Sequence, residues 1–118
     1  MDELYKDKII ELYSKKENFG VLADKTQEVS HVNPSCDDEI TFEVKMQNNK
    51  ILDAKFHGKL CFVSTIAAEV LAENIIGMTI EEIRKLSKKD VDLFLGTNII
   101  STRVGCELFP LEALKKLK

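Results

Sequence analysis

The sequence has little of what several protein classes depend on. Its 118 residues include no tryptophan, two prolines, five glycines and three cysteines. An odd number of cysteines argues against a disulfide framework of a secreted protein, which normally uses pairs. In a reducing compartment, dispersed cysteines serve as buried core residues, reactive thiols or metal ligands, and the surrounding residues must discriminate between these uses.

Long apolar runs and a basic surface are also missing. The most apolar stretch, 63–72, is interrupted by Ser64, Thr65 and Glu69, and it is far shorter than the roughly 20 residues of a membrane span. The net charge is -3, and no basic stripe indicates a nucleic-acid surface. The first residues are acidic and amphipathic rather than signal-like. We therefore expect a cytoplasmic protein without a membrane or nucleic-acid partner.

The hydrophobic pattern predicts an α+β fold over one domain, 1–118. An amphipathic repeat predicts a first helix that Asn18 and Gly20 would end. Alternating patterns predict strands, and the turn Asn48-Asn49 joins the second strand to the third in a hairpin. An apolar helix closed by Gly77 follows. The expected ranges are 2–16 for the helix, 26–32, 39–46 and 51–57 for the strands, and 63–76 for the apolar helix.

Three more helices are expected after Gly77. Thr79 and Ser87 each precede a carboxylate by three residues, which is the pattern of a capping box. The last helix should begin at or just after Cys106 and tolerate Pro110 only within its first turn. Strands followed by helices predict a small antiparallel three-stranded sheet packed against several helices rather than alternating βαβ units.

Each cysteine lies at a junction between expected elements. Cys36 follows the turn sequence Asn33-Pro34-Ser35 and precedes two aspartates. Cys61 separates a strand from a helix, and Cys106 precedes the last helix. A structural cysteine is more often found among apolar residues inside an element, so Cys36 favours a ligand role. The apolar neighbours of Cys61 and Cys106 fit a core position and a ligand position equally well.

The chemistry of a helix N-terminus favours thiolates at two of these positions. Backbone amides there stabilise an anion, so we expect lowered thiol pKa values for Cys61 and Cys106. Three converging thiolates suit zinc or an iron–sulfur cluster, with a fourth ligand from oxygen or nitrogen. The candidates for that fourth ligand are Asp38, Asp37, His31 and His57. Asp38 is the best, because it lies two residues after Cys36, whereas nothing directs the two histidines toward the site.

Four stretches carry a resemblance to the IscU/SufU/NifU-type iron–sulfur cluster assembly scaffolds, from about Leu4 to Leu117. They are LYKDKIIELYSKKENFGVL; NPSCDDEITFEV, which resembles the family's N-P-x-C-G-D; DAKFHGKLC, which resembles A-x-F-x-G-x-G-C; and the R-x-x-C that ends at Cys106 before an amphipathic helix.

The resemblance implies a site and partners. Cys36, Cys61 and Cys106 would be the metal or cluster ligands, and Asp38 would be the family's aspartate, which is thought to keep a bound [2Fe-2S] cluster labile. The implied partners are a cysteine desulfurase, an iron or electron source, and apo-protein acceptors, with monomer and homodimer both left open. A mobile thiolate such as Cys106 would suit persulfide transfer.

The sequence also departs from the family pattern. Asp37 and Leu60 stand where glycines are usual, and Gly105 stands where IscU-type members carry a histidine. No Leu-Pro-Pro-Val-Lys chaperone motif precedes Cys106. Arg103 fits the SufU-type pattern, yet the 44 residues between Cys61 and Cys106 leave no room for the insertion typical of SufU proteins.

Three functional hypotheses follow. The first is a scaffold, not an enzyme, that assembles a [2Fe-2S] cluster and transfers it. The second is a zinc-bound sulfurtransferase in which the same four residues hold Zn²⁺ and one thiolate accepts sulfur from the desulfurase. The third is a binding module with structural cysteines, which fits poorly with three thiols at junctions beside carboxylates.

Overall fold

A computed structural model describes residues 3–33, 37–96 and 104–118, so Cys36 and Arg103 lie outside the described residues. Within those ranges no helix has the length and apolar character to cross a membrane. The chain forms an α+β fold, as expected. Its elements are α1 (Glu3–Lys15), β1 (Gln27–Val32), β2 (Glu39–Gln47), β3 (Lys50–Lys59), α2 (Phe62–Asn74), α3 (Ile80–Arg84), α4 (Lys88–Leu95) and α5 (Val104–Leu114).

The three strands form an antiparallel sheet in the order β1-β2-β3. The hairpin between β2 and β3 turns at Asn48 and Asn49, whose φ angles are 55° and 66°. Asparagine tolerates this left-handed conformation better than most residues, which is why the turn could be located from the sequence.

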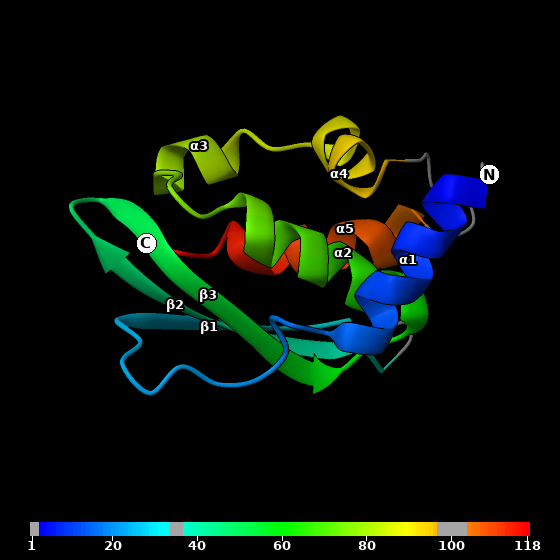
Figure 1. Cartoon of the computed structure of the whole chain (residues 1–118). Helices are drawn as coiled ribbons and strands as arrows, with labels where there is room; N and C mark the ends of the chain where they lie inside the picture. Colours follow the sequence, from blue (N-terminus) through cyan, green and yellow to red (C-terminus); the bar gives the residue numbers. More distant parts are fainter. Residues whose placement is uncertain (1–2, 34–36, 97–103) are drawn as a thin grey trace.

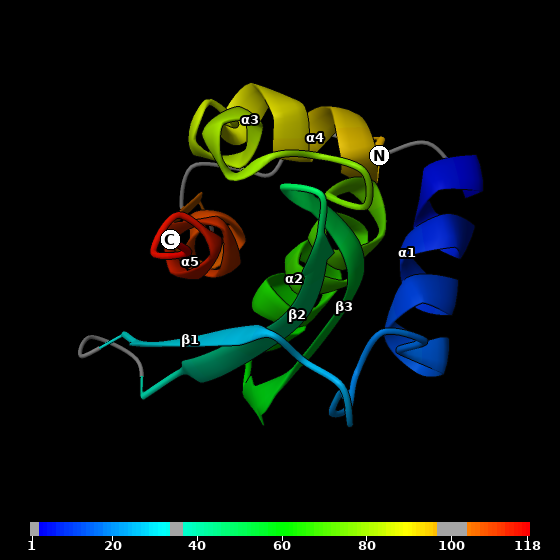
Figure 2. The same cartoon turned by 90° about the vertical axis from the view of Figure 1, so that its left-hand side faces the viewer.

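The helices cover one face of the sheet (Figures 1 and 2). Helix α2 lies centrally, between α1 and α5, and α3 and α4 pack over it on the side away from the sheet. The apolar side of the sheet, which includes Phe42 and Phe56, is fully buried against α2 and α5. Burial on all sides explains why α2 is apolar around most of its circumference.

The segment between α1 and β1 runs along β3 and then across the opposite face of the sheet. Phe56 exchanges backbone hydrogen bonds with this segment: its amide donates to the Asn18 carbonyl at 2.9 Å, and its carbonyl accepts from the Gly20 amide at 2.7 Å. Farther on, the Leu22 amide donates to the Glu43 carboxylate at 3.0 Å. The segment thereby buries Glu43 on the face that the helices leave open.

Two expectations about the last helix were wrong. Helix α5 begins at Val104, two residues before Cys106, and Pro110 is its seventh residue rather than a first-turn residue. Proline has no amide hydrogen, so the carbonyl four residues earlier, that of Cys106, loses its helical donor. The Ser64 hydroxyl takes the place of that donor at 3.0 Å. A tertiary hydrogen bond thus compensates for proline inside the helix.

Gly58 is required by a close approach of backbone. It adopts φ 139°, and a Cβ built on it would lie 2.2 Å from the Glu39 carbonyl oxygen. Any side chain would force β3 away from the first residues of β2. The glycine therefore holds the end of β3, which leads to Cys61, against the strand that follows Asp38.

Candidate metal and sulfur site

Cys61 caps the N-terminus of α2. Its backbone is extended, with φ -72° and ψ 173°, and its sulfur accepts from the Ser64 amide at 3.4 Å. The sulfur therefore lies beside the first amide hydrogens of the helix. The expected position of Cys61 between a strand and a helix is confirmed. Cys61 is partly exposed.

Asp38 lies beside Cys61 although 23 residues separate them in the chain. The carboxylate is 7% exposed, and its Oδ2 accepts from the Cys61 amide at 3.4 Å and from the Ser64 hydroxyl at 3.2 Å. Strand pairing explains the meeting, because the start of β2 pairs with the end of β3. One of the proposed oxygen ligands is therefore held at the N-terminus of α2.

Ser64 links three of the candidate site residues, and sequence reasoning did not single it out. This fully buried serine places its Oγ 3.0 Å from the Cys106 carbonyl oxygen, 3.2 Å from Asp38 Oδ2 and 3.4 Å from Cys61 Sγ. A hydroxyl has one hydrogen, so it donates to either the carbonyl or the carboxylate at a given moment, while the Cys61 thiol can donate to it. The sequence signal that could have pointed to Ser64 is Pro110. It has no amide hydrogen for the carbonyl of Cys106, four residues earlier, which therefore needs another donor.

The two histidines make contacts elsewhere. His57 Nε2 lies 2.8 Å from Glu43 Oε2 on the sheet face opposite the helices. His31 Nε2 lies 3.2 Å from Glu112 Oε2, and its ring stacks on Phe109 with centroids 5.0 Å apart. Both imidazole rings therefore contact residues other than Asp38, Cys61, Ser64 and Cys106.

The complete set of four ligands is a prediction that the described residues do not test. Cys36 lies outside them, and within them no group of three or more His, Cys, Asp or Glu residues is placed to hold a metal ion. What the structure brings together is Asp38, Cys61 and the backbone of Cys106, through Ser64.

A buried acid follows Cys106 directly. Glu107 is 0% exposed, and its carboxyl group lies beside the Asp92 carboxyl group and the Lys88 ammonium. Lys88 Nζ lies 3.7 Å from Oε1. Burial, and then the neighbouring Asp92 carboxylate, raises the pKa of Glu107 to about 8, while Lys88 opposes the rise. A neutral acid therefore packs α5 against α4 next to the third cysteine at neutral pH.

Comparison with known proteins gives the family. Residues 4–116 match the family model described as the NifU-like N terminal domain. This chain belongs to the NifU-like N-terminal domain family. Its members include the IscU, SufU and NifU proteins of iron–sulfur cluster assembly.

Two members of the NifU-like family illustrate its range. The chain is 35% identical over 95 residues to the iron–sulfur cluster assembly scaffold protein IscU of Thermotoga maritima, covering 80% of this chain and 67% of that protein. It is 29% identical over 133 residues to the zinc-dependent sulfurtransferase SufU of Bacillus subtilis, covering 98% and 90%. A SUF-system protein from Fervidobacterium islandicum superposes with a TM-score of 0.73 at 27% identity, covering 98% and 93% of the chains.

The structure shows the local environment of three residues that depart from the NifU-like pattern. Asp37, at the usual glycine, adopts φ 60°, the left-handed conformation that glycine favours and aspartate tolerates. Leu60 packs partly buried against the core. A Cβ at Gly105 would meet no atom of the described residues within 4 Å. Packing against the described residues therefore does not require a glycine there.

Proposed function

We propose that this chain assembles a [2Fe-2S] cluster on Cys36, Cys61, Cys106 and Asp38 and transfers it to apo-proteins in the cytoplasm. The observation that carries the proposal is the place of Asp38. Asp38 is 7% exposed, and its carboxylate lies at the N-terminus of α2, where it accepts from the Cys61 amide and from the Ser64 hydroxyl. A role as the oxygen ligand beside the Cys61 thiol would explain why a carboxylate is held at this position.

The donor set fits a cluster that must be released. Iron in a sulfide cluster prefers thiolate, and a carboxylate oxygen is a harder and weaker match. The same Asp38 oxygen accepts from the Ser64 hydroxyl and from the Cys61 amide. These hydrogen bonds compete with metal coordination, so they favour release of the cluster to an acceptor.

Sulfur would come from a cysteine desulfurase. A thiolate of this chain attacks the outer sulfur of the desulfurase persulfide; a new S–S bond forms on the chain, the old S–S bond breaks, and the desulfurase leaves as a thiolate. The reaction needs an accessible thiolate as nucleophile. Cys61 and Cys106 are both partly exposed, and Cys61 lies at the N-terminus of α2.

The zinc-bound sulfurtransferase is a second candidate, and Gly105 favours it. The IscU-type histidine that would add a ligand before Cys106 is absent, although its Cβ would meet no atom of the described residues within 4 Å. The same four residues offer Zn²⁺ three thiolates and one carboxylate, a tetrahedral set that suits the ion. Zinc would hold the thiols deprotonated until one of them accepts sulfur.

Metal analysis and a visible absorption spectrum separate the two candidates. Anaerobically reconstituted protein should show sulfide-to-iron charge-transfer bands and bind about two irons per chain. The purified protein would instead be colourless with one zinc per chain under the second candidate, and this result would overturn the scaffold proposal.

Substitution of Asp38 tests the role given to it. In the Asp38→Ala variant the reconstituted cluster should last longer and transfer more slowly to an apo-ferredoxin acceptor. Asp37→Asn is the matched control, because asparagine tolerates the positive φ of that position and the neighbouring Asp38 is kept. An unchanged cluster lifetime in a folded Asp38→Ala protein would contradict the role of Asp38.

A further inference from the structure

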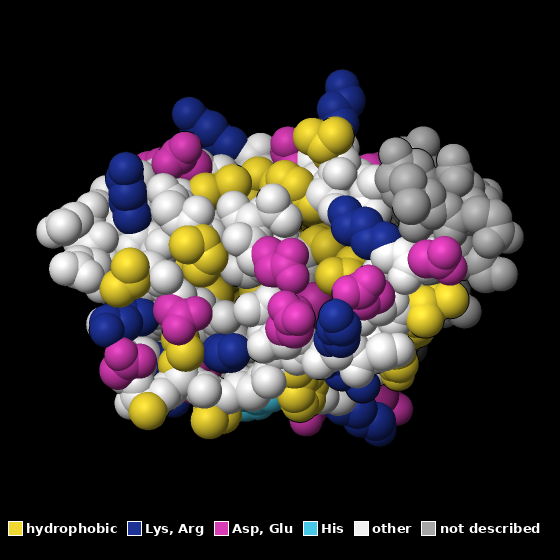
Figure 3. Space-filling model, viewed as in Figure 1, with side chains coloured by type: hydrophobic (Ala, Val, Ile, Leu, Met, Phe, Trp, Pro, Cys, Tyr) yellow, Lys and Arg dark blue, Asp and Glu magenta, His cyan; other side chains and the backbone are white. Residues whose placement is uncertain are grey.

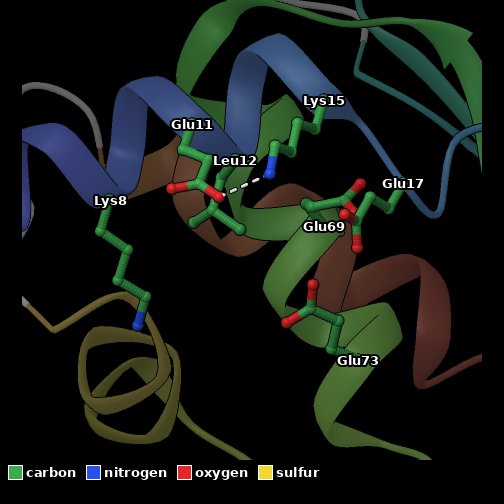
Figure 4. Close-up of a pocket in the computed structure, with 7 residues that line it drawn as sticks. All are labelled: Lys8, Glu11, Leu12, Lys15, Glu17, Glu69 and Glu73. Carbon is green, nitrogen blue, oxygen red and sulfur yellow. Dashed lines mark hydrogen bonds and ion pairs between the residues drawn. The ribbon is translucent and has the colours of Figure 1, made fainter.

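A groove of about 190 Å³ lies between α1 and α2, apart from the cysteine site. Glu11, which is paired with Lys15, lines this groove together with three further carboxylates: Glu17 just after α1, and Glu69 and Glu73 on consecutive turns of α2. We call it the acidic groove. Figure 4 shows these three side chains directed into the same space, and Figure 3 shows acidic side chains gathered on this face of the molecule.

Glu69 is the buried residue of the acidic groove, with 1% exposure. Its Oε1 accepts from the Asn18 backbone amide at 2.9 Å and from Asn18 Nδ2 at 2.8 Å. Its Oε2 is buried with no hydrogen-bond partner among the described residues. A carboxylate oxygen without a donor is destabilising, so the groove contains an acceptor that a ligand could satisfy.

Lys8 and Lys15 also line the acidic groove, and each donates to an acceptor other than Glu17, Glu69 and Glu73. Lys15 Nζ bonds Glu11 Oε1 at 2.8 Å, as the dashed line in Figure 4 marks, and Lys8 Nζ donates to the Phe94 carbonyl at 3.1 Å. Among the side chains that the structure describes, none forms an ion pair with Glu17, Glu69 or Glu73.

The negative charges of the groove also repel one another. Burial raises the pKa of Glu69 and of Glu73, and Glu17 adds to both rises by its charge, while Asn18 opposes the rise at Glu69 and Lys8 opposes it at Glu73. A cation placed among the three carboxylates would remove this repulsion. The groove therefore has both an unpartnered acceptor and an unbalanced charge.

The positions of the three carboxylates favour one kind of cation over another. A metal ion needs ligands converging on one point, and the described residues contain no group of three His, Cys, Asp or Glu placed for that. A guanidinium instead spreads five N–H donors over a planar fork and can reach carboxylates that lie apart. Its slender aliphatic stem would lie along Leu12, which also lines the groove.

We propose that the acidic groove binds the guanidinium group of an arginine side chain presented by a partner protein. A peptide-borne arginine fits better than the free amino acid, because free arginine carries an α-carboxylate that the three glutamates would repel. Glu69 follows Cys61 by eight residues in α2, about 12 Å at 1.5 Å per residue, so the arginine would anchor a partner beside the cysteine site.

Titration with N-acetyl-L-arginine amide, followed by amide NMR shifts of the metal-free chain, tests the proposal. Saturable shifts should centre on Asn18 and Glu69, and the capped arginine should bind at least threefold more tightly than capped lysine or free arginine. Glu69→Gln and Glu73→Gln should each weaken binding at least threefold. Glu81→Gln, on the exposed face of α3, is the matched control and should leave binding unchanged.

Several results would overturn the proposal. They are the absence of saturable shifts, equal binding by the Glu69→Gln protein, equal or tighter binding of lysine or free arginine, and selective broadening of groove signals by Mn²⁺ that capped arginine does not relieve. The titration uses metal-free protein and does not depend on the proposed function. Its failure is therefore distinguishable from failure of the cluster reconstitution.

Discussion

Glu43 and Glu107 are both buried glutamates, yet their surroundings differ on the two sides of the sheet. Glu43, 3% exposed on the face opposite the helices, accepts from the Leu22 amide and from His57, with Lys25 at 3.5 Å. The Leu22 hydrogen bond, ahead of the contributions from His57 and Lys25, lowers the pKa of Glu43 despite burial. Glu107, in the helical layer, lies beside Asp92 and Lys88, and burial, followed by the Asp92 contact, raises its pKa.

Glu43 and Glu107 therefore affect the stability of the fold in opposite ways. Glu43 is ionised and attaches the segment after α1 to the sheet, so its removal should cost stability. Glu107 is held neutral near pH 7, and keeping its proton costs stability as the pH rises above the ordinary glutamate pKa. Glu69 is intermediate, since one oxygen has two donors and the other has none among the described residues.

Removal of Glu43 should have the largest effect. Glu43→Ala leaves the Leu22 amide without its acceptor and His57 without its partner, so we expect a loss of about 3 kcal/mol in the free energy of unfolding at pH 7. Urea denaturation measures it. The loss should shrink as the pH falls through the lowered pKa of Glu43, because protonation removes the ionic contribution in the wild type as well.

The control for Glu43 is its cross-strand neighbour Glu28, which is paired in register with Glu43 but exposed. Glu28→Ala should change stability by less than about 1 kcal/mol. Equal effects of the two substitutions would remove the distinction between the partnered buried acid and an ordinary surface acid.

Glu107→Gln should stabilise the metal-free protein at alkaline pH. Between the ordinary glutamate pKa of 4.5 and the folded value of about 8, the unfolded chain loses its proton first, so wild-type stability falls as the pH rises through this window. Glutamine does not titrate. We expect the variant to gain a few kcal/mol over wild type at pH 8 and little at pH 4.

Denaturant unfolding at several pH values checks the Glu107 prediction. Glu112→Gln, on the exposed side of the same helix, is the control and should show no such pH-dependent gain. A Glu107→Gln protein that is uniformly less stable from pH 4 to pH 8 would contradict the interpretation of Glu107 as a neutral buried acid.

Asn18→Ala tests the hydrogen bonds that Glu69, the third buried glutamate, accepts from Asn18. The substitution removes the side-chain donor at 2.8 Å but keeps the backbone donor, so the expected loss is about 1 kcal/mol in the free energy of unfolding. A double-mutant cycle measures the pair. In a Glu69→Ala background the same Asn18 substitution should cost less, and strict additivity of the two changes would disprove the coupling.

Lys25→Ala should have the smallest effect. Its ammonium lies 3.5 Å from Glu43 Oε1, but its side chain is 39% exposed. Solvent screens such a pair, and we expect a loss of no more than about 0.5 kcal/mol that disappears in 1 M salt. A salt-independent loss comparable to that of Glu43→Ala would mean that the ion pair, rather than the Leu22 amide, makes the buried charge tolerable.

Most secondary structure was predictable because its signals are local. The alternation in β2, the asparagine turn and the capping residues Thr79 and Ser87 each act within a few residues, and the structure confirms all of them. Pro110 was misplaced because its cost inside α5 is compensated by Ser64, 46 residues away in the chain. No local pattern reveals a compensation between two helices.

The sequence by itself determined the element order, the positions of Cys61 and Asp38 in the chain, and the family resemblance that assigns four ligands. Only the tertiary structure decided that Ser64 joins Asp38, Cys61 and the Cys106 carbonyl, that His31 and His57 bond elsewhere, and that Glu69 lines a groove with Glu17. The physical reason is that capping and strand patterns depend on neighbours in the chain. Burial, pKa and hydrogen bonding depend on residues that only packing brings together.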